Sequence, residues 1–243
     1  MGRRMLLKGK TALITGSATG IGEGVARLFA EQGANLILVD RDGPRNTAVA
    51  QSLNARARTC DVSSAAAVQA LAQDLGPVDI LINNAGIYPR KPLLETTEEE
   101  WDHMQAVNLK SVFLLTKAIL PAMIQRGSGK IVNMSSVTFH LGTANLSHYV
   151  ASKGGVIGLT RSAAREAGPH NVHVNCITPG AILVEAEKAV QTEEALREIM
   201  NQQSLKRRLL PLDIARTCLF LASELSDGLT GQTINVDGGW VMH

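Results

Sequence analysis

Three residues of this sequence have the types and the spacing needed for proton transfer between a tyrosine and a substrate oxygen. Tyr149 and Lys153 are four residues apart, and Ser136 precedes the tyrosine by thirteen residues. If Ser147 caps a helix, Tyr149 and Lys153 share one face of it, about one turn apart. A free tyrosine titrates near pH ~10, so its pKa must fall by roughly three units, about 4 kcal/mol, before it acts as a base near neutrality.

The ammonium group of Lys153, held ~4 Å from the tyrosine, supplies about that much energy at an effective dielectric constant of ~20. We therefore predict that Lys153 lowers the pKa of Tyr149 and makes it a proton-transfer group. Ser136 would hydrogen-bond a substrate alcohol or carbonyl oxygen and hold it where the tyrosine exchanges its proton. A tyrosine and a lysine four residues apart also fit an ordinary surface helix, so this interpretation depends on the rest of the chain.

The length and composition allow one large α/β core or two small domains, and the charge balance indicates a small ligand. The chain has 243 residues, 45% of them hydrophobic, and a formal net charge of +2. This nearly balanced charge gives no positively charged surface that would attract nucleic acid or an anionic membrane. The sequence also has no recognisable signal peptide and no charge-free segment long enough to span a membrane. Cys60, Cys176 and Cys218 follow no metal-ligand spacing and lie in apolar runs, as buried thiols of a reducing compartment do. We expect a cytoplasmic protein without a metal.

A glycine-rich loop near the N-terminus has the context of a dinucleotide phosphate site. The apolar run 11–15 leads into Gly16-Ser17-Ala18-Thr19-Gly20-Ile21-Gly22, and a helical pattern follows. In a strand, turn and helix unit the glycines let the backbone approach a pyrophosphate, and the helix N-terminus supplies free N–H groups. We expect the cofactor to contact Gly16, Thr19, Gly20, Ile21 and Gly22.

The residue after the second predicted strand, 35–39, bears on the choice between NAD and NADP. Asp40 lies 18 residues beyond Gly22, where a carboxylate accepts hydrogen bonds from the adenosine ribose hydroxyls and repels a 2′-phosphate. Arg41 is the counter-argument, because its guanidinium could accept that phosphate. We give more weight to Asp40 and expect NAD, with both residues in contact with the cofactor.

Polar and small residues follow the later predicted strands as well. Asp61 ends the strand at 55–60 and would either cap the next helix or meet the adenine amino group. Asn83-Asn84-Ala85-Gly86 follows the strand at 78–82, and its small residues permit close approach of a ligand. Because ligands collect at the carboxyl ends of parallel strands, the expected cofactor contacts include Asp61, Val62, Asn83, Ala85 and Gly86.

Eleven predicted elements alternate between strand and helix without a linker or repeat. This order predicts a single domain over 1–243, a doubly wound parallel sheet of the Rossmann type with helices on both faces. One long helix is expected from 98 to about 126, with Asn108, a poor mid-helix residue, in its interior. A second is expected at 147–167. The polar stretch 181–210 should form a helical flap over the site.

With these residues in hand, the chain resembles the short-chain dehydrogenase/reductase family over essentially its whole length. Thr15-Gly16-(x)3-Gly20-Ile21-Gly22, Asn83-Asn84-Ala85-Gly86, Asn108, Ser136, Tyr149-(x)3-Lys153 and Pro179-Gly180 match the family's motifs in order and spacing. The resemblance implies that Tyr149 is the acid/base and that Lys153 is its electrostatic partner and a ribose ligand. It also implies that Ser136 positions the substrate oxygen and that Asn108 holds a water in a proton relay to Lys153.

The resemblance further implies cofactor contacts from Pro179, Gly180 and Ile182, and a homotetramer built partly on the two long helices. Ser135 is the rival of Ser136, but the thirteen-residue spacing favours Ser136, and alternation along a strand turns Ser135 back into the fold. The chain departs from the family pattern at Val184, where a threonine usually helps to hold the nicotinamide carboxamide. That hydroxyl contact is therefore lost.

The first hypothesis for function is NAD-linked interconversion of a secondary alcohol and a ketone. Within the family, the chain is similar to NAD-preferring bacterial aryl-alcohol, pyridoxal, sugar and polyol dehydrogenases. One alternative is an NADPH-dependent reductase of 3-oxoacyl thioesters on acyl carrier protein, which shares the catalytic residues. Another is a dinucleotide-sensing protein that performs no chemistry.

Overall fold

The computed structural model describes residues 5–184 and 192–242, and these are built around one seven-stranded parallel sheet. Its strand order is β3-β2-β1-β4-β5-β6-β7. The order reverses between β1 and β4, which is where a doubly wound sheet opens a crevice at its carboxyl edge. The strands are β1 (Thr11–Thr15), β2 (Asn35–Asp40), β3 (Arg56–Thr59), β4 (Ile80–Asn83), β5 (Gly129–Met134), β6 (Val172–Pro179) and β7 (Thr233–Val236). The first four correspond to the strands predicted at 11–15, 35–39, 55–60 and 78–82.

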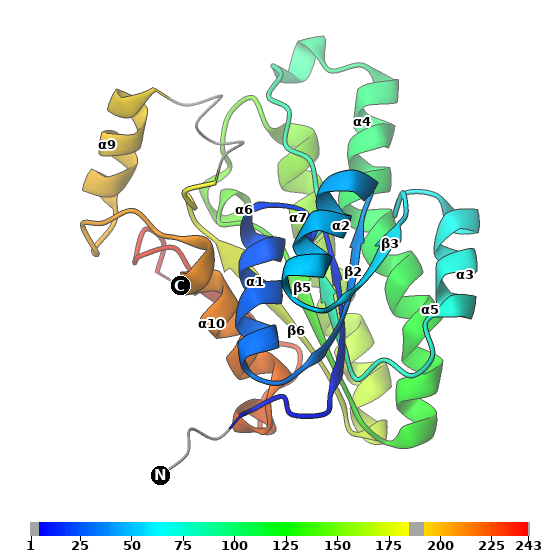
Figure 1. Cartoon of the computed structure of the whole chain (residues 1–243). Helices are drawn as coiled ribbons and strands as arrows, with labels where there is room; N and C mark the ends of the chain where they lie inside the picture. The colour runs from blue at the N-terminus through cyan, green and yellow to red at the C-terminus, as the bar shows by residue number, and fades with distance from the viewer. Residues whose placement is uncertain (1–4, 185–191, 243) are drawn as a thin grey trace.

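Helices cover both faces of the sheet, as predicted (Figure 1). Side chains alternate along β1, so Ala12 and Ile14 pack on one apolar cluster and Leu13 on the other. The first cluster is covered by α1 (Gly20–Glu31), α2 (Gly43–Ser52) and α10 (Pro211–Ala222). The second is covered by α3 (Ala65–Asp74), α5 (Ser111–Arg126) and α7 (Ser147–Ala167).

The helix expected over 98–126 is interrupted at Asn108. It consists of α4 (Glu98–Gln105), a π-helical turn η2 (Ala106–Lys110) and α5. By length and apolar composition this run is long enough to cross a membrane. In the fold, however, Leu115, Ile119 and Met123 of α5 are buried in the second cluster against the sheet. The apolar residues of α5 therefore serve the core.

Helix α7, which carries Tyr149 and Lys153, has the predicted bounds, but its cap differs from the expectation. Leu146 occupies the N-cap position, and the buried hydroxyl of Ser147 has no hydrogen-bond partner among the described residues. The cap at Ser147, from which the shared helix face was argued, is therefore not present. Tyr149 and Lys153 still share one face of α7, because both residues lie within the same continuous helix.

The glycines inside α7 differ in their surroundings. A β-carbon on Gly154 would come within 2.7 Å of the Phe139 ring, and one on Gly155 within 2.6 Å of Leu109. Gly154 and Gly155 are thus closely packed against other parts of the same chain. A β-carbon on Gly158 would meet no described atom within 4 Å, so that position faces outward.

The expected flap is described in part, since 185–191 lies outside the described residues. Its helix is α9 (Glu193–Gln202), which stands apart from the sheet beside the C-terminal segment (Figure 1). The Trp240 indole donates to Gln202 Oε1 at 2.8 Å, and the backbone N–H of Leu205 donates to Gly238 at 2.8 Å. Short elements complete the chain: η1 (Leu93–Glu95), α6 (Thr138–Leu141), η3 (Gly168–His170) and η4 (Glu224–Ser226).

Candidate active site

Two adjoining pockets open at the carboxyl edge of the sheet. The larger has a volume of about 630 Å³ and the smaller about 260 Å³, and both are walled by Ile21, Asn84, Gly86, Tyr88 and Val184. The predicted residues that line the larger pocket are Gly16, Thr19, Gly20, Ile21, Asp40, Arg41, Asp61, Val62, Ala85 and Gly86. Those that line the smaller pocket are Ile21, Gly86, Ser136, Tyr149, Lys153, Pro179, Gly180 and Ile182.

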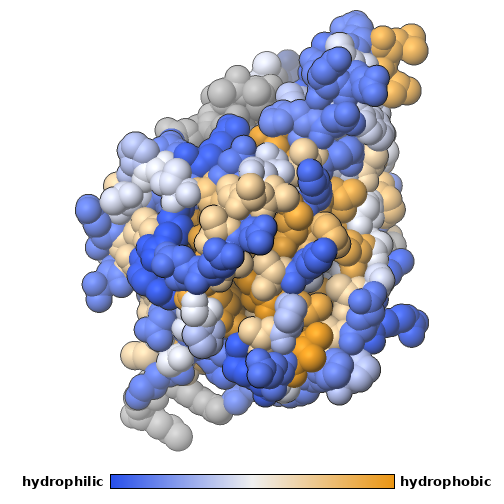
Figure 2. All heavy atoms as spheres, turned by 90° about the vertical axis from the view of Figure 1, so that its right-hand side faces the viewer, coloured by the Kyte–Doolittle hydropathy of each residue, from blue (hydrophilic) through white to orange (hydrophobic). Residues whose placement is uncertain are grey.

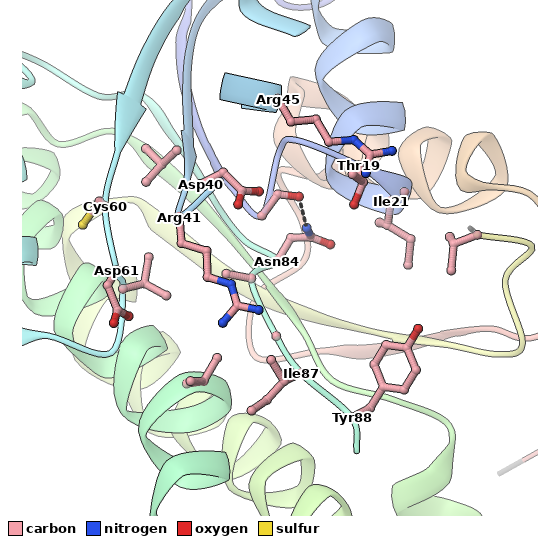
Figure 3. A pocket seen from close by; sticks show the side chains of 18 of the residues that line it. Thr19, Ile21, Asp40, Arg41, Arg45, Cys60, Asp61, Asn84, Ile87 and Tyr88 are labelled. Carbon is pink, nitrogen blue, oxygen red and sulfur yellow. Dashed lines mark hydrogen bonds between the residues drawn. The ribbon is translucent and has the colours of Figure 1, made fainter. Parts of the chain in front are cut away.

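The glycine loop forms a backbone cradle that side chains would fill. Gly16 and Gly20 have positive φ angles of 64° and 61°. A β-carbon on Gly16 would lie 2.9 Å from the Cα of Ala85, and one on Gly22 would lie 2.0 Å from the carbonyl oxygen of Gly16. Asn84 braces the loop by donating its Nδ2 to Gly16 O at 3.1 Å (Figure 3). The cradle therefore tolerates glycine at these positions and little else.

The N-terminus of α1 opens onto this cradle. Thr19 occupies its N-cap position, and among the described side chains none caps the helix there. Uncapped N–H groups and the positive end of the helix dipole favour a bound anion. Together with the glycine cradle they fit the pyrophosphate of a dinucleotide.

The far end of the larger pocket is lined by charged side chains, namely Asp40 at the end of β2, Arg41 directly after it, and Arg45 in α2. Asp40 is held in place because the backbone N–H groups of Ala18 and Asp42 each donate to its carboxylate at 3.0 Å. Figure 3 shows Asp40 directed toward the glycine loop and Arg41 extending across the pocket toward Ile87. The carboxylate and the guanidinium therefore face different parts of the space that an adenosine would occupy.

Asp61 also lines the larger pocket, and its carboxylate is tied to its own loop. Ser63 donates to Asp61 from its backbone N–H at 2.9 Å and from its hydroxyl at 2.7 Å, and these bonds lower the pKa of the Asp61 carboxyl. The next helix, α3, is capped by Ser64 instead. The helix-capping alternative for Asp61 is therefore wrong.

The two serines at the end of β5 point in opposite directions. Ser135 donates its hydroxyl to the carbonyl of Lys153 at 2.8 Å and is turned into the fold, as strand alternation predicts. Ser136 lines the smaller pocket, and its hydroxyl oxygen accepts hydrogen bonds from the backbone and side chain of Thr138 at 3.2 and 2.9 Å. Its hydroxyl also hydrogen-bonds Tyr149.

The expected effect of Lys153 on Tyr149 is wrong for this conformation. Burial raises the pKa of Tyr149 to about 12, outweighing the opposing effect of the Ser136 hydrogen bond, and burial lowers the pKa of Lys153 to about 8. The lysine Nζ lies 5.5 Å from the tyrosine ring centroid and donates to the carbonyl of Met134 at 2.9 Å. Desolvation therefore dominates over the attraction between the two charged forms.

Asn108, at the π-helical turn, lines neither pocket and is fully buried. Its amide oxygen accepts from the backbone N–H of Ile87 at 2.8 Å, and its Nδ2 donates to the Ile87 carbonyl at 2.8 Å. It thus holds the segment that separates the two pockets. The proton-relay role that the family resemblance implies stays a prediction.

Two other predicted cofactor residues, Gly22 and Asn83, also lie outside the pocket walls. Asn83 is buried, and its Nδ2 donates to Asn133 Oδ1 at 2.8 Å, so its side chain braces β4 against β5 rather than meeting a ligand. Gly22 acts through its lack of a side chain beside Gly16. Any cofactor contact from Asn83 must come from its backbone.

Several pocket residues were not included in the sequence-based set of site residues. Asn84 lies in a motif that was recognised, but its side chain was not assigned to the site. Tyr88 and the segment 183–205 were expected to line the substrate pocket from their position around the catalytic residues, and Tyr88 and Ile199 do line the smaller pocket. The residues that were not expected come from α2, the loop after Gly86, α4 and the C-terminal segment: Arg45, Arg90, His103 and Trp240. Their types and spacing follow no motif.

Comparison with known proteins agrees with this geometry. A family model described as enoyl-(acyl carrier protein) reductase matches residues 16–241. The chain belongs to the short-chain dehydrogenase/reductase family. It therefore has the family's oxidoreductase chemistry on CH–OH groups, with a nicotinamide dinucleotide as cofactor.

Individual relatives differ in their named substrates. D-xylose 1-dehydrogenase of Caulobacter vibrioides is 36% identical over 96% of this chain and 96% of its own length. A 3-oxoacyl-[acyl-carrier-protein] reductase of Chlamydia trachomatis is 37% identical over 96% of this chain and 98% of its own. A solved structure of a putative gluconate dehydrogenase from Agrobacterium tumefaciens has a TM-score of 0.94 at 34% identity, covering 99% of this chain and 100% of that one.

Replacement of Tyr149 by Phe tests its proton-transfer role. We expect kcat to fall by roughly 10²- to 10⁴-fold, the usual contribution of general acid–base catalysis, because the phenylalanine ring keeps the packing and removes only the hydroxyl. Binding of the reduced dinucleotide, followed by its fluorescence, should change little. Turnover close to that of the wild-type protein would remove Tyr149 from the mechanism.

The buried lysine predicts a pH-dependent stability. The pKa of Lys153 is about 8 in the folded protein and near ~10.4 when unfolded, so between these values the unfolded chain binds more protons and stability rises with pH. Relative to Lys153→Met, the wild-type protein should gain about 2 kcal/mol in free energy of unfolding from pH 7 to 9.5. Urea unfolding of both proteins measures this, and parallel pH profiles would contradict it.

Proposed function

We propose that this protein is an NAD-dependent dehydrogenase that interconverts a secondary alcohol and a ketone, with Tyr149 as the acid/base. The observation that carries the proposal is the meeting of Ser136, Tyr149 and Lys153 in one pocket that adjoins the glycine cradle. The named relatives include a sugar dehydrogenase and a putative gluconate dehydrogenase. We therefore propose a substrate of the sugar or polyol class.

The chemistry follows from the protonation state of the tyrosine. A nicotinamide ring supplies or accepts the hydride when it is bound beside these residues. With a pKa of about 12, Tyr149 is protonated at neutral pH and is ready to donate its proton to a carbonyl oxygen. Ser136 holds that oxygen by a hydrogen bond. In the oxidative direction Tyr149 must first lose its own proton, and the phenolate then takes the proton from the alcohol.

The preference for NAD rests on Asp40. Its carboxylate is fixed by two backbone hydrogen bonds at the far end of the larger pocket. A fixed carboxylate accepts hydrogen bonds from ribose hydroxyls and repels a 2′-phosphate. Arg41 and Arg45 line the same pocket, so loss of the Asp40 charge would leave a site that suits a phosphate.

Two other functions fit the fold less well. A reductase of 3-oxoacyl thioesters has support from the Chlamydia trachomatis relative, and Asp40 argues against its NADPH. A dinucleotide sensor would have no use for a tyrosine, serine and lysine gathered in a second pocket. The cofactor preference separates the proposed dehydrogenase from the reductase, and turnover separates both from the sensor.

We also propose a homotetramer that uses the outer faces of α5 and α7. Figure 2 shows apolar side chains gathered on the face that includes α5, where the Phe113 side chain is 45% exposed. Gly158 leaves the neighbouring surface of α7 open for close approach. A cytoplasmic location is proposed as well, because Cys60, Cys176 and Cys218 are all free thiols, and cell fractionation tests it.

Titration with NADH and NADPH, followed by NAD- and NADP-linked turnover, tests the cofactor proposal. The wild-type protein should prefer NADH, and Asp40→Asn should weaken NADH binding by roughly 10- to 100-fold, as expected for hydrogen bonds to a charged group, while improving NADPH binding. Asp42→Asn is the matched control, because Asp42 caps α2 outside the pocket wall. A wild-type preference for NADPH would overturn the proposal and favour the reductase.

Light scattering of glycine-to-arginine variants tests the tetramer. Gly158→Arg should dissociate the assembly, because a long charged side chain would enter the proposed contact between α7 helices. Gly228→Arg, also at an open position, should leave the mass unchanged. A tetrameric Gly158→Arg protein, or a monomeric wild-type protein, would contradict the proposal.

A further inference from the structure

The smaller pocket has a positive charge that its catalytic residues do not account for. Its charged lining residues are Lys153 and Arg90, and no Asp or Glu is among the described residues that line it. The ammonium of Lys153 is buried and already donates to Met134. Arg90, by contrast, is exposed, and within the described part of the chain no residue hydrogen-bonds or pairs with it.

The neighbouring cation, Lys91, differs from Arg90 because it is paired within the chain. Lys91 donates to both carboxylate oxygens of Glu100, at 2.7 and 2.8 Å. Its charge is thereby neutralised by the chain. Of these two adjacent cations, Lys91 is paired with Glu100, whereas the guanidinium of Arg90 is available to a group that enters the pocket.

The backbone around Arg90 is held on both sides. Asn108 binds the N–H and the carbonyl of Ile87, each at 2.8 Å, and the N–H of Lys91 donates to the carbonyl of Asn145 at 2.8 Å. Between these anchors, the Tyr88 ring packs edge-on against the Tyr149 ring with centroids 6.4 Å apart. Arg90 is therefore presented from a fixed segment next to the proposed acid/base.

The remaining walls of the smaller pocket are largely apolar, with Leu146, Val184, Ile199 and Trp240 among them. They suit the carbon skeleton of a substrate, and none of these described wall residues carries a competing charge. A guanidinium matches a carboxylate through two parallel hydrogen bonds, and this bidentate geometry makes the pair specific.

We propose that Arg90 determines substrate specificity by binding a carboxylate, and that the substrate is a hydroxy acid of sugar-acid size rather than a neutral alcohol. This inference rests on the proposed function, since it places the acid's hydroxyl at Ser136 and Tyr149 and its carboxylate at Arg90. Arg90 is the one guanidinium among the described residues of this pocket, and one guanidinium favours a carboxylate over a phosphate monoester, whose two charges take more than one cation.

Steady-state kinetics with paired substrates tests the inference. The acids D-gluconate, D-galactonate and 3-hydroxybutyrate are compared with the neutral D-glucitol, galactitol and 2-butanol, using the cofactor that the wild-type protein prefers. The wild-type protein should have a much higher kcat/KM for at least one acid than for its neutral partner. Arg90→Gln should raise KM for that acid by roughly 10- to 100-fold, the loss of a hydrogen-bonded charge pair, with kcat within a few-fold of wild type.

Two variants control for indirect effects. Arg90→Lys keeps the charge and should recover part of the lost affinity, whereas Lys91→Gln removes the neighbouring cation and should leave the KM of the acid unchanged. The KM for the neutral partner and the Kd for the cofactor should not change in Arg90→Gln. An equal rise in KM for acids and neutral alcohols would mean that Arg90 only supports the loop, and would overturn the inference.

The remaining outcomes separate this inference from the proposed function. A protein that binds NAD and oxidises neutral alcohols but no acid keeps the proposed function and overturns the role of Arg90. Turnover of glucose 6-phosphate with a KM that depends on Arg90 would mean that Arg90 binds a phosphate group. The assignment of a carboxylate to Arg90 would then be wrong. A protein that binds no dinucleotide or turns over neither class would overturn both.

Discussion

The arrangement of both pockets depends on the two hydrogen bonds between the Asn108 side chain and the backbone of Ile87. They fix the segment that follows β4, and that segment supplies Gly86 to the wall between the pockets and Tyr88 to the side of Tyr149. Because the amide is fully buried, loss of either partner would leave a polar group without a hydrogen bond, at a cost of about 1–3 kcal/mol. Asn108 lies within the π-helical turn η2, the kind of irregularity that occurs frequently at functional sites.

Burial sets the chemistry of the pair that the segment encloses. The pKa of Tyr149 is raised and that of Lys153 lowered, so each group is driven toward its neutral form. The lysine keeps one strong acceptor, the carbonyl of Met134 at the end of β5. The same strand end therefore holds the lysine and, two residues later, provides Ser136. A proton-transfer site of this kind is costly to bury, and the backbone of the sheet edge supplies the polar contacts that compensate.

Strands, glycine turns and most helices were predictable because their signals are local. The run 11–15, the glycines at 16, 20 and 22, and the helix 147–167 follow from side-chain alternation, turn chemistry and apolar periodicity. The orientation of Ser135 relative to Ser136 followed from strand alternation alone. Asn108 was recognised as unsuited to a helix interior, but the π-helical turn that accommodates it depends on contacts with Ile87, which is 21 residues away. The true N-cap of α7 was missed for the same reason, since tertiary contacts decide it.

The C-terminal segment illustrates how a substrate pocket can be closed by residues that no motif marks. Trp240 lines the smaller pocket while its indole N–H is bound to Gln202 at the end of α9. One side chain therefore connects the chain terminus to the helix that contributes Ile199 to the same pocket. The catalytic residues lie at the sheet edge and on α7, whereas Ile199 and Trp240 come from α9 and the C-terminal segment, which the Trp240–Gln202 hydrogen bond joins. Substrate choice can thus vary through these segments and the loop after β4 while the proton-transfer geometry stays constant.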